Sequence, residues 1–139
     1  MTILQTLLLY ASTLFVFLGI DAAWLTTVAP KFYSSNIGHL MAEKPNLLPA
    51  LIFYLLFIVG VLVFTTIPAL KEQSIQKVFI NGALFGLLTY ATYDLTNIAT
   101  LKEWPLIVTV VDMIWGTILS VVTSLASYYI ATKILKISL

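Results

Sequence analysis

Three aspartates, Asp21, Asp94 and Asp112, each interrupt a long apolar stretch of the sequence. An acidic residue at the centre of a membrane helix costs about 2.5–3.5 kcal/mol on insertion scales, so folding alone does not account for three of them. Ionisable residues inside a membrane commonly bind ions or carry protons. These carboxylates are therefore the first candidates for chemistry.

The composition explains why the stretches around them are interpreted as membrane helices. Of the 139 residues, 60% are hydrophobic and only 9% are charged, whereas soluble domains have about 25% charged residues. A spanning helix needs about 20 apolar residues, and four such segments with short loops use up the chain. The sequence predicts an all-α fold: an integral membrane four-helix antiparallel bundle that forms a single transmembrane domain over residues 1–139. The expected helices are about 3–29, 47–68, 78–101 and 106–132.

Prolines and short polar segments mark the ends of these helices. Pro30 and Lys31 are expected to close the first helix, and the polar stretch 31–46 has too weak a helical period to assign. The turn 102–105 is so short that the helices on either side are expected to be antiparallel neighbours. Four spans put both termini on one side, and four lysines there against three on the other side favour the cytoplasm for that side.

The three aspartates are expected to lie at one depth. Asp21 and Asp94 come eight and seven residues before the ends of the first and third helices, and Asp112 comes seven residues after Pro105. At a rise of about 1.5 Å per residue, each carboxylate lies roughly 10–12 Å inside the same membrane face. Tyr54 reaches the same depth on the second helix.

Side chains close to the aspartates could line a shared pocket. An i,i+3 spacing, repeated in Asp21–Trp24, Asp112–Trp115 and Asp94–Asn97, places both members on one helical face. The indole and amide N–H groups can donate to the carboxylates. If the helices are shorter than expected, Asp21 and Asp112 become interfacial caps instead, and the tryptophans belong to an aromatic belt. The expected ligand-binding residues are Asp21, Asp94, Asp112, Trp24, Asn97, Trp115, Tyr90 and Tyr54.

A glycine stripe on the third segment indicates close helix packing. Gly82 and Gly86 have the spacing that lets membrane helices approach closely, and the same stripe continues to Asp94. Asp112 and Gly116 repeat this pattern on the last segment. The acids are thus expected to point into the bundle rather than at lipid. A homodimer across Gly82 and Gly86 is the alternative use of this face.

The composition also restricts cofactors and partners. The chain has no cysteine and one histidine, which excludes disulfides, thiol redox chemistry and zinc sites built from imidazoles. A net charge of +1 provides no basic field for nucleic acid. The lipid bilayer is the expected partner. No cofactor is expected, except that Ca²⁺ or Mg²⁺ could bind to Asp21, Asp94 and Asp112.

Carboxylates in a low-dielectric interior without a basic partner cannot all be ionised. They must hold protons, bind a cation or receive a cationic ligand, which predicts proton- or cation-coupled transport or ligand binding. The alternative is a membrane-embedded enzyme or enzyme subunit that acts on lipid, because aspartates can hold Mg²⁺ or act as general acid and base. A third hypothesis is a structural or accessory subunit whose acids only lock helix packing.

The run YATYDLTNIATLKEWP, from Tyr90 to Pro105, resembles the signature of a family of small bacterial four-helix membrane proteins catalogued as a domain of unknown function. The segments that begin with Asp21-x-x-Trp24 and Asp112-x-x-Trp115 resemble its other two motifs, and the resemblance covers nearly the whole chain. It implies a multi-pass protein of the bacterial inner membrane. The genes of the family lie near genes for lipid modification and stress responses, which implies at most a leaning toward lipid chemistry.

Overall fold

The computed structural model describes residues 1–139 and contains helices and loops without a β-strand. The fold is therefore all-α, as the sequence predicts. In chain order, the elements are α1 (Ile3–Thr27), α2 (Ala29–Ile37), the 3₁₀-helix η1 (Gly38–Leu40), α3 (Leu47–Gly60), the π-helix η2 (Val61–Thr66), α4 (Ile67–Glu72), α5 (Ile75–Thr100), α6 (Leu106–Tyr129) and the π-helix η3 (Ile130–Ile134).

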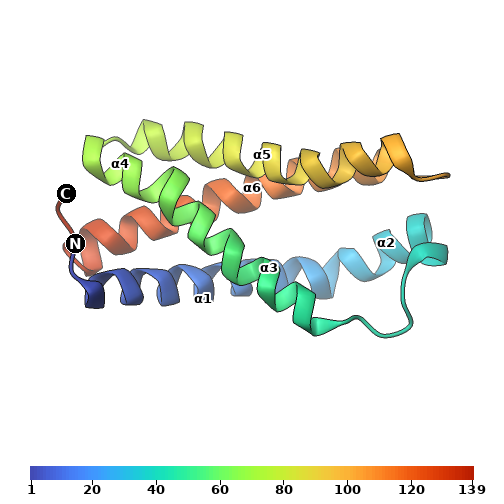
Figure 1. Ribbon diagram of the computed structural model, residues 1–139, viewed down its shortest axis with the longest axis horizontal. Helices are drawn as coiled ribbons and strands as arrows, with labels where there is room; N and C mark the ends of the chain where they lie inside the picture. The colour runs from blue at the N-terminus through green and yellow to red at the C-terminus, as the bar shows by residue number, and fades with distance from the viewer.

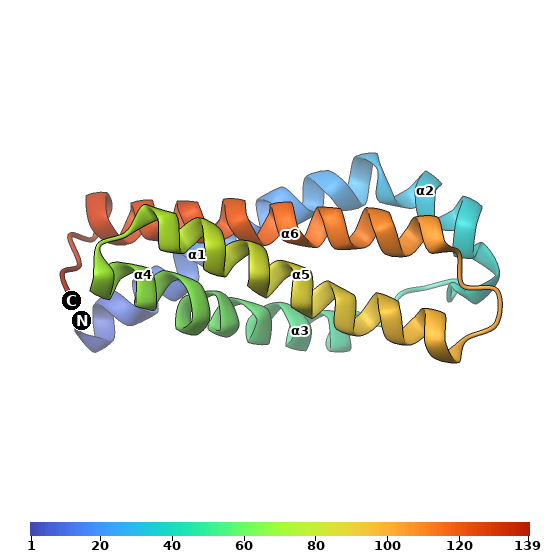
Figure 2. The same cartoon turned by 90° about the horizontal axis from the view of Figure 1, so that it is seen from above.

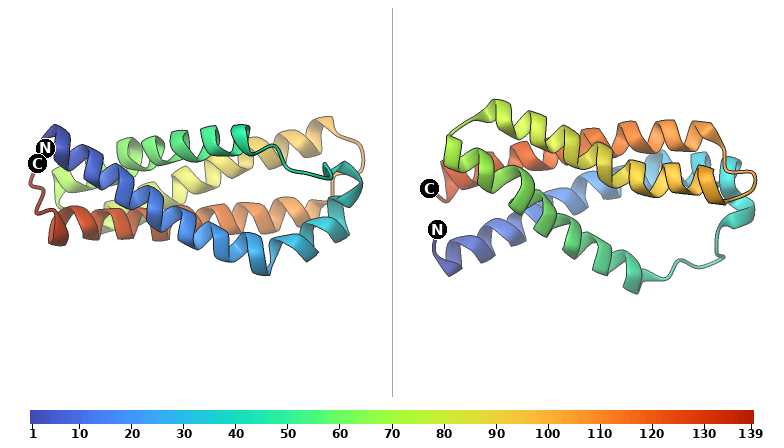
Figure 3. Two further views of the ribbon diagram at one scale, coloured as in Figure 1. Left: turned by 90° about the horizontal axis from the view of Figure 1, so that it is seen from below. Right: turned by 45° about the horizontal axis from the view of Figure 1, so that its top comes forward.

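The long helices run along one common direction, and both chain termini lie at the same end of the molecule (Figure 1). We call this the terminal end. The opposite end carries α2, the loop after η1 and the turn between α5 and α6 (Figure 2). Helices α5 and α6 form the most extensive pair in the molecule, and the run α3–η2–α4 crosses the bundle obliquely (Figure 3).

Three helical segments are long and apolar enough to cross a membrane: Ile3–Thr27, Leu47–Glu72 and Leu106–Ile134. Large apolar side chains such as Leu4, Phe15, Leu56 and Phe64 are exposed on the outside of the bundle. Extended apolar surfaces of this kind mark contact with a membrane or a partner. Helix α5 has 26 residues but is not among the three most apolar segments.

The first helix ends at Thr27, within two residues of the predicted end, but a second helix follows it directly instead of a loop. The Val28 N–H still donates to the Trp24 carbonyl at 3.1 Å, and the chain continues as α2 with Pro30 in its first turn. A proline is tolerated there because the N–H groups of a first turn have no partner within the helix. The bend at Val28 therefore redirects the helix, and residues 31–37 belong to α2 rather than to a loop.

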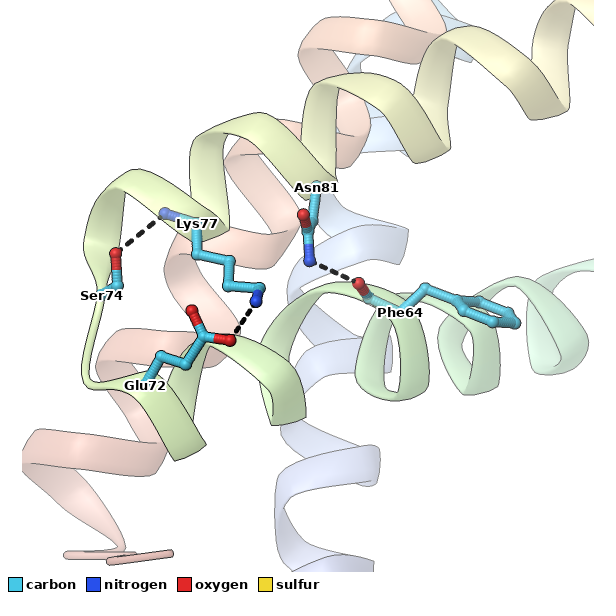
Figure 4. A network of polar contacts seen from close by, with 5 residues as sticks. All are labelled: Phe64, Glu72, Ser74, Lys77 and Asn81. Atoms are coloured by element: carbon cyan, nitrogen blue, oxygen red, sulfur yellow. Dashed lines mark hydrogen bonds and ion pairs between the residues drawn. The ribbon is translucent and has the colours of Figure 1, made fainter.

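Pro68 also lies inside a helical run, which continues to Glu72 instead of ending near residue 68. Pro68 has no N–H to give to the carbonyl of Phe64, four residues earlier. The side-chain amide of Asn81, on α5, donates to this carbonyl at 2.9 Å (Figure 4). The amide thus gives this carbonyl a side-chain donor, and it attaches α5 to the neighbouring run.

The last two helices agree with the sequence prediction to within a few residues. Helix α5 begins at Ile75 because the Ser74 hydroxyl accepts from the Lys77 N–H at 3.2 Å, and Lys77 also pairs with Glu72 across the turn (Figure 4). Helix α6 begins at Leu106, directly after Pro105.

The glycine stripe packs against α6 of the same chain. A Cβ atom on Gly86 would lie 2.4 Å from the Gly116 carbonyl oxygen, and one on Gly82 would lie 3.2 Å from the Cα atom of Val121. The stripe therefore permits backbone-to-backbone contact between α5 and α6. The alternative of a homodimer across Gly82 and Gly86 is wrong for this face, because it is already filled.

Candidate functional site

The three aspartates lie at matching positions near the end opposite the termini. Asp21 and Asp94 each precede the last residue of their helix by six positions, and Asp112 follows Leu106 by six. This corresponds to about 9 Å from the helix end. All three residues are buried. The alternative in which Asp21 and Asp112 are helix caps is wrong, because both lie well inside their helices.

Asp21 is held by Tyr54. The Tyr54 hydroxyl, on α3, donates to Oδ2 of Asp21 at 2.7 Å, which confirms that the second helical run reaches the depth of the carboxylates. A hydrogen bond to a charged group contributes about 1.5–3 kcal/mol. This bond uses one carboxylate oxygen of Asp21, and the other accepts no hydrogen bond from the protein.

Asp112 is held by a residue that the sequence prediction missed. The Tyr33 hydroxyl, on α2, donates to Oδ1 of Asp112. Burial raises the pKa of the Tyr33 phenol above its ordinary value, and the Asp112 carboxylate raises it further, so Tyr33 keeps its proton. The sequence carried no clear signal for this contact, because a proline that begins a helix cannot be told from one that ends a helix.

Asp94 is fully buried, and neither of its carboxylate oxygens has a hydrogen-bond partner. It lies next to Asp112 across the α5–α6 interface. The two helices are also joined one turn away from this pair, at Thr109. The Thr109 hydroxyl donates to the Asp94 backbone carbonyl at 3.5 Å and accepts from the Trp104 indole at 3.1 Å. Two carboxyl groups therefore face each other with no positive charge between them, since the one ion pair of the chain joins Lys77 to Glu72.

The two motif tryptophans stack on each other instead of binding their own aspartates. The rings of Trp24 and Trp115 lie 4.4 Å apart and 10° from parallel. The indole nitrogen of Trp115 is buried near Asp21 without a hydrogen bond. The i,i+3 spacing thus identified the right face, but the expected hydrogen bonds from Trp24 to Asp21 and from Trp115 to Asp112 are absent.

A cavity of about 200 Å³ lies beside Asp21. Six of its nine lining residues are aromatic, and Asp21 is the only charged one. The walls come from α1, α2, α3, α5 and α6. The lining residues are Asp21, Trp24, Leu25, Tyr33, Ala50, Phe53, Tyr54, Tyr90 and Trp115.

The cavity separates the expected site residues into groups. Asp21, Trp24, Tyr54, Tyr90 and Trp115 line it, whereas Asp94 and Asp112 form a buried pair behind it. Asn97 contributes to neither group. Its carbonyl accepts from the Leu101 N–H at 2.9 Å, and its side chain lies beside Tyr93 at the end of α5.

The expected joint metal site is not formed. No three acidic or histidine side chains are gathered closely enough to hold one metal ion. Asp21 is engaged by Tyr54 on one side of the site, and the Asp94–Asp112 pair lies on the other. The option of Ca²⁺ or Mg²⁺ bound by all three carboxylates is therefore wrong for this arrangement.

Apolar helices of spanning length and carboxylates buried among them define the chain as a helical membrane protein. It belongs to the DUF2177 family, described as predicted membrane proteins, whose family model matches residues 6–129. This confirms the resemblance to a membrane family of unknown function. No curated protein and no solved structure matches the chain.

Proposed function

We propose that this chain is a four-span protein of the bacterial inner membrane that binds a small organic cation in the aromatic cavity, as part of a transport or ligand-binding function. The observation that carries the proposal is the cavity beside Asp21, with one carboxylate surrounded by six aromatic side chains. Aromatic rings grouped around a carboxylate are suited to an ammonium group, particularly a methylated one.

Two features of the lining support a cation over a neutral ligand. The faces of Trp24, Trp115 and the surrounding phenol rings attract positive charge, each by about 0.5–1 kcal/mol when exposed and about 2 kcal/mol when dry. Asp21 adds a full negative charge when it is ionised, and one of its oxygens is not used by Tyr54. No lysine or histidine lines the cavity to neutralise that charge.

The size of the cavity restricts the ligand. Its volume of about 200 Å³ is several times the roughly 30 Å³ that a water molecule occupies in the liquid. This is room for an ammonium group with short substituents and not for a lipid chain. Because the walls come from five helices, a bound cation would hold these helices in one arrangement, and its release would free them to move. A transporter needs ligand binding to be coupled to the arrangement of its helices in this way.

Choline should therefore bind to the purified protein in detergent, and the Asp21→Asn variant should bind it at least about tenfold more weakly, because a charged contact of about 1.5–3 kcal/mol is lost. The measurement is intrinsic tryptophan fluorescence. A Trp104→Phe background leaves Trp24 and Trp115, both in the cavity, as the only tryptophans. Glu43→Gln, at an exposed acid, is the matched control and should bind normally.

A neutral isostere of choline, 3,3-dimethylbutan-1-ol, tests the charge itself. It should bind at least about tenfold more weakly than choline, a difference of about 1.4 kcal/mol. Equal affinity for the two compounds, or no saturable response to choline, would refute the cation site. Dihexanoyl phosphatidylcholine, tested alongside, distinguishes a free ammonium compound from a lipid headgroup as the source of the ligand.

The proposed four spans place both termini in the cytoplasm and the loop before α3 outside. Because the chain has no native cysteine, single cysteines can report this directly. In intact cells, a membrane-impermeant maleimide should label Glu43→Cys and should leave Ser138→Cys unlabelled until the cells are permeabilised. Both positions are exposed, so burial would not mask the reaction. Identical labelling of the two positions would contradict an even number of spans.

A further inference from the structure

Helix α6 carries a row of buried hydroxyl groups that starts beyond the carboxylates and leads toward the terminal end. Ser120, Thr123, Ser124 and Ser127 follow Asp112 at helical spacing, and all four are fully buried. From Asp112 to Ser127 the helix rises about 22 Å. Buried polar groups extend over most of the length of a helix whose other faces are apolar.

Hydroxyl groups from two other helical runs join this row. Thr65 donates to Ser124 at 2.9 Å, and Thr13 donates to Ser127 at 2.9 Å. Thr65 lies in the π-helix η2, and π-helical turns occur frequently at functional sites. The row is thus the centre of a polar core that includes α1, η2 and α6.

Two members of the row have no hydrogen-bond partner. The Ser120 and Thr123 hydroxyls are fully buried and unpaired, as are both carboxylate oxygens of Asp94. A hydroxyl on a membrane helix normally bonds to the carbonyl four residues before, as Thr117 does to Met113 at 2.7 Å. An unpaired buried hydroxyl is destabilising, and an internal water with two or more polar partners relieves this.

Tyr90 fills the gap between the carboxylates and the row. A Cβ atom on Gly116 would lie 2.1 Å from Cδ2 of the Tyr90 ring, so the ring lies flat against α6 midway between Asp112 and Ser120. The acids Asp21, Asp94 and Asp112 surround this side chain. A phenol can both donate and accept a hydrogen bond, which is what a group that relays protons between the carboxylates and the row would have to do.

We propose that this row is a proton path, which runs from the Asp94–Asp112 pair past Tyr90 and along Ser120, Thr123, Ser124 and Ser127 to the terminal end. The path ends one residue before Tyr128, which lines a cavity of about 370 Å³ together with Lys133 and residues near the C-terminus. Ser120 and Thr123, the two unpaired hydroxyls of the row, would each need a bridging water to complete the chain of hydrogen bonds.

The proton balance along this path is simple. One carboxyl group of the pair gives up its proton to the first hydroxyl or water, and each following group accepts one proton and releases another. The last group releases a proton at the terminal end, and the carboxylate takes up a new one from the other side. Tyr33, on α2, and Tyr93, on α5, are the further titratable groups beside the pair. No co-reactant is consumed.

The test is proton flux through the full chain reconstituted in liposomes that contain a pH-sensitive dye, with a potassium gradient and valinomycin as the driving force. The wild-type protein should carry protons faster than protein-free vesicles. Asp94→Asn, Ser120→Ala and Thr123→Val should each slow this flux about tenfold or more, since a positioned proton-transfer group typically contributes at least that factor. Thr117→Val is the matched control, because its hydroxyl bonds within its own helix, and it should conduct normally.

The path would be refuted if wild-type flux were no higher than that of protein-free vesicles. It would also be refuted if Thr117→Val slowed the flux as much as Ser120→Ala does. Thermal unfolding of each variant in detergent separates a lost path from a lost fold. The path shares Tyr90 with the cavity but does not use the Asp21 carboxylate or its hydrogen bond to Tyr54. A wild-type protein that conducts protons but does not bind choline therefore rejects the cation site alone.

Discussion

Replacement of Gly86 by alanine should destabilise the protein by about 3 kcal/mol, the upper end of the range for overpacked interiors. The added Cβ atom would lie 2.4 Å from the Gly116 carbonyl oxygen and 2.7 Å from the Cβ atom of Ser120. The first of these contacts is with backbone, which cannot rotate out of the way. The two helices must separate, and every contact of the most extensive helix pair is weakened. Thermal unfolding in detergent measures the loss.

Gly19→Ala is the matched control for this substitution. Gly19 lies in the middle of α1 with nothing within 4 Å of its added Cβ atom. Alanine there should stabilise the helix by about 0.5–1 kcal/mol, because glycine loses more backbone freedom on folding. The same glycine-to-alanine substitution is thus expected to destabilise the protein at Gly86 and to stabilise it at Gly19. Similar unfolding temperatures for both variants would show that α5 and α6 do not pack at Gly86 as described.

Asp94→Asn should stabilise the protein by about 1–3 kcal/mol and slow the proposed proton flux about tenfold or more. The carboxyl group is fully buried without a hydrogen bond and lies beside Asp112. Asparagine has the same shape and no charge, so both the desolvation of a charge and the repulsion from Asp112 are removed. A gain in stability with a loss of function is typical of residues that are kept for activity.

Unfolding in detergent at neutral pH, together with proton flux in liposomes, tests this prediction. Glu43→Gln changes an exposed carboxylate and should leave both quantities within experimental scatter. If Asp94→Asn instead lowers the unfolding temperature, Asp94 stabilises the fold, and the hypothesis that the acids only lock helix packing gains support.

The positions of the helices and the depth of the acids could be predicted because both follow from the lengths of apolar segments. Asp21, Asp94 and Asp112 divide their segments at similar distances from one end, and any antiparallel packing brings them to one level. The packing face of α5 could also be predicted, from Gly82 and Gly86, because only small residues let two helix backbones approach closely.

The partner of Asp112 and the stacking of the two tryptophans could not be predicted, because they come from the bend at Val28 and from contacts between helices. Pro30 has the same sequence signature whether it ends a helix or begins the next one, and only the second case brings Tyr33 to Asp112. The spacing of Trp24 and Trp115 identifies the side of each helix they occupy, but the relative rotation of α1 and α6 decides that the rings stack on each other.

The modest hydropathy of α5 has a consequence for biosynthesis. In the proposed four-span arrangement, α5 is the only span that is not among the segments apolar enough by composition to cross a membrane. Its polar groups are shielded only when Gly86 rests on Gly116 and Asp94 faces Asp112. Because Leu101–Pro105 is all that separates the two helices, they can enter the bilayer as a preformed hairpin. We therefore expect integration of α5 to wait until the ribosome has completed α6.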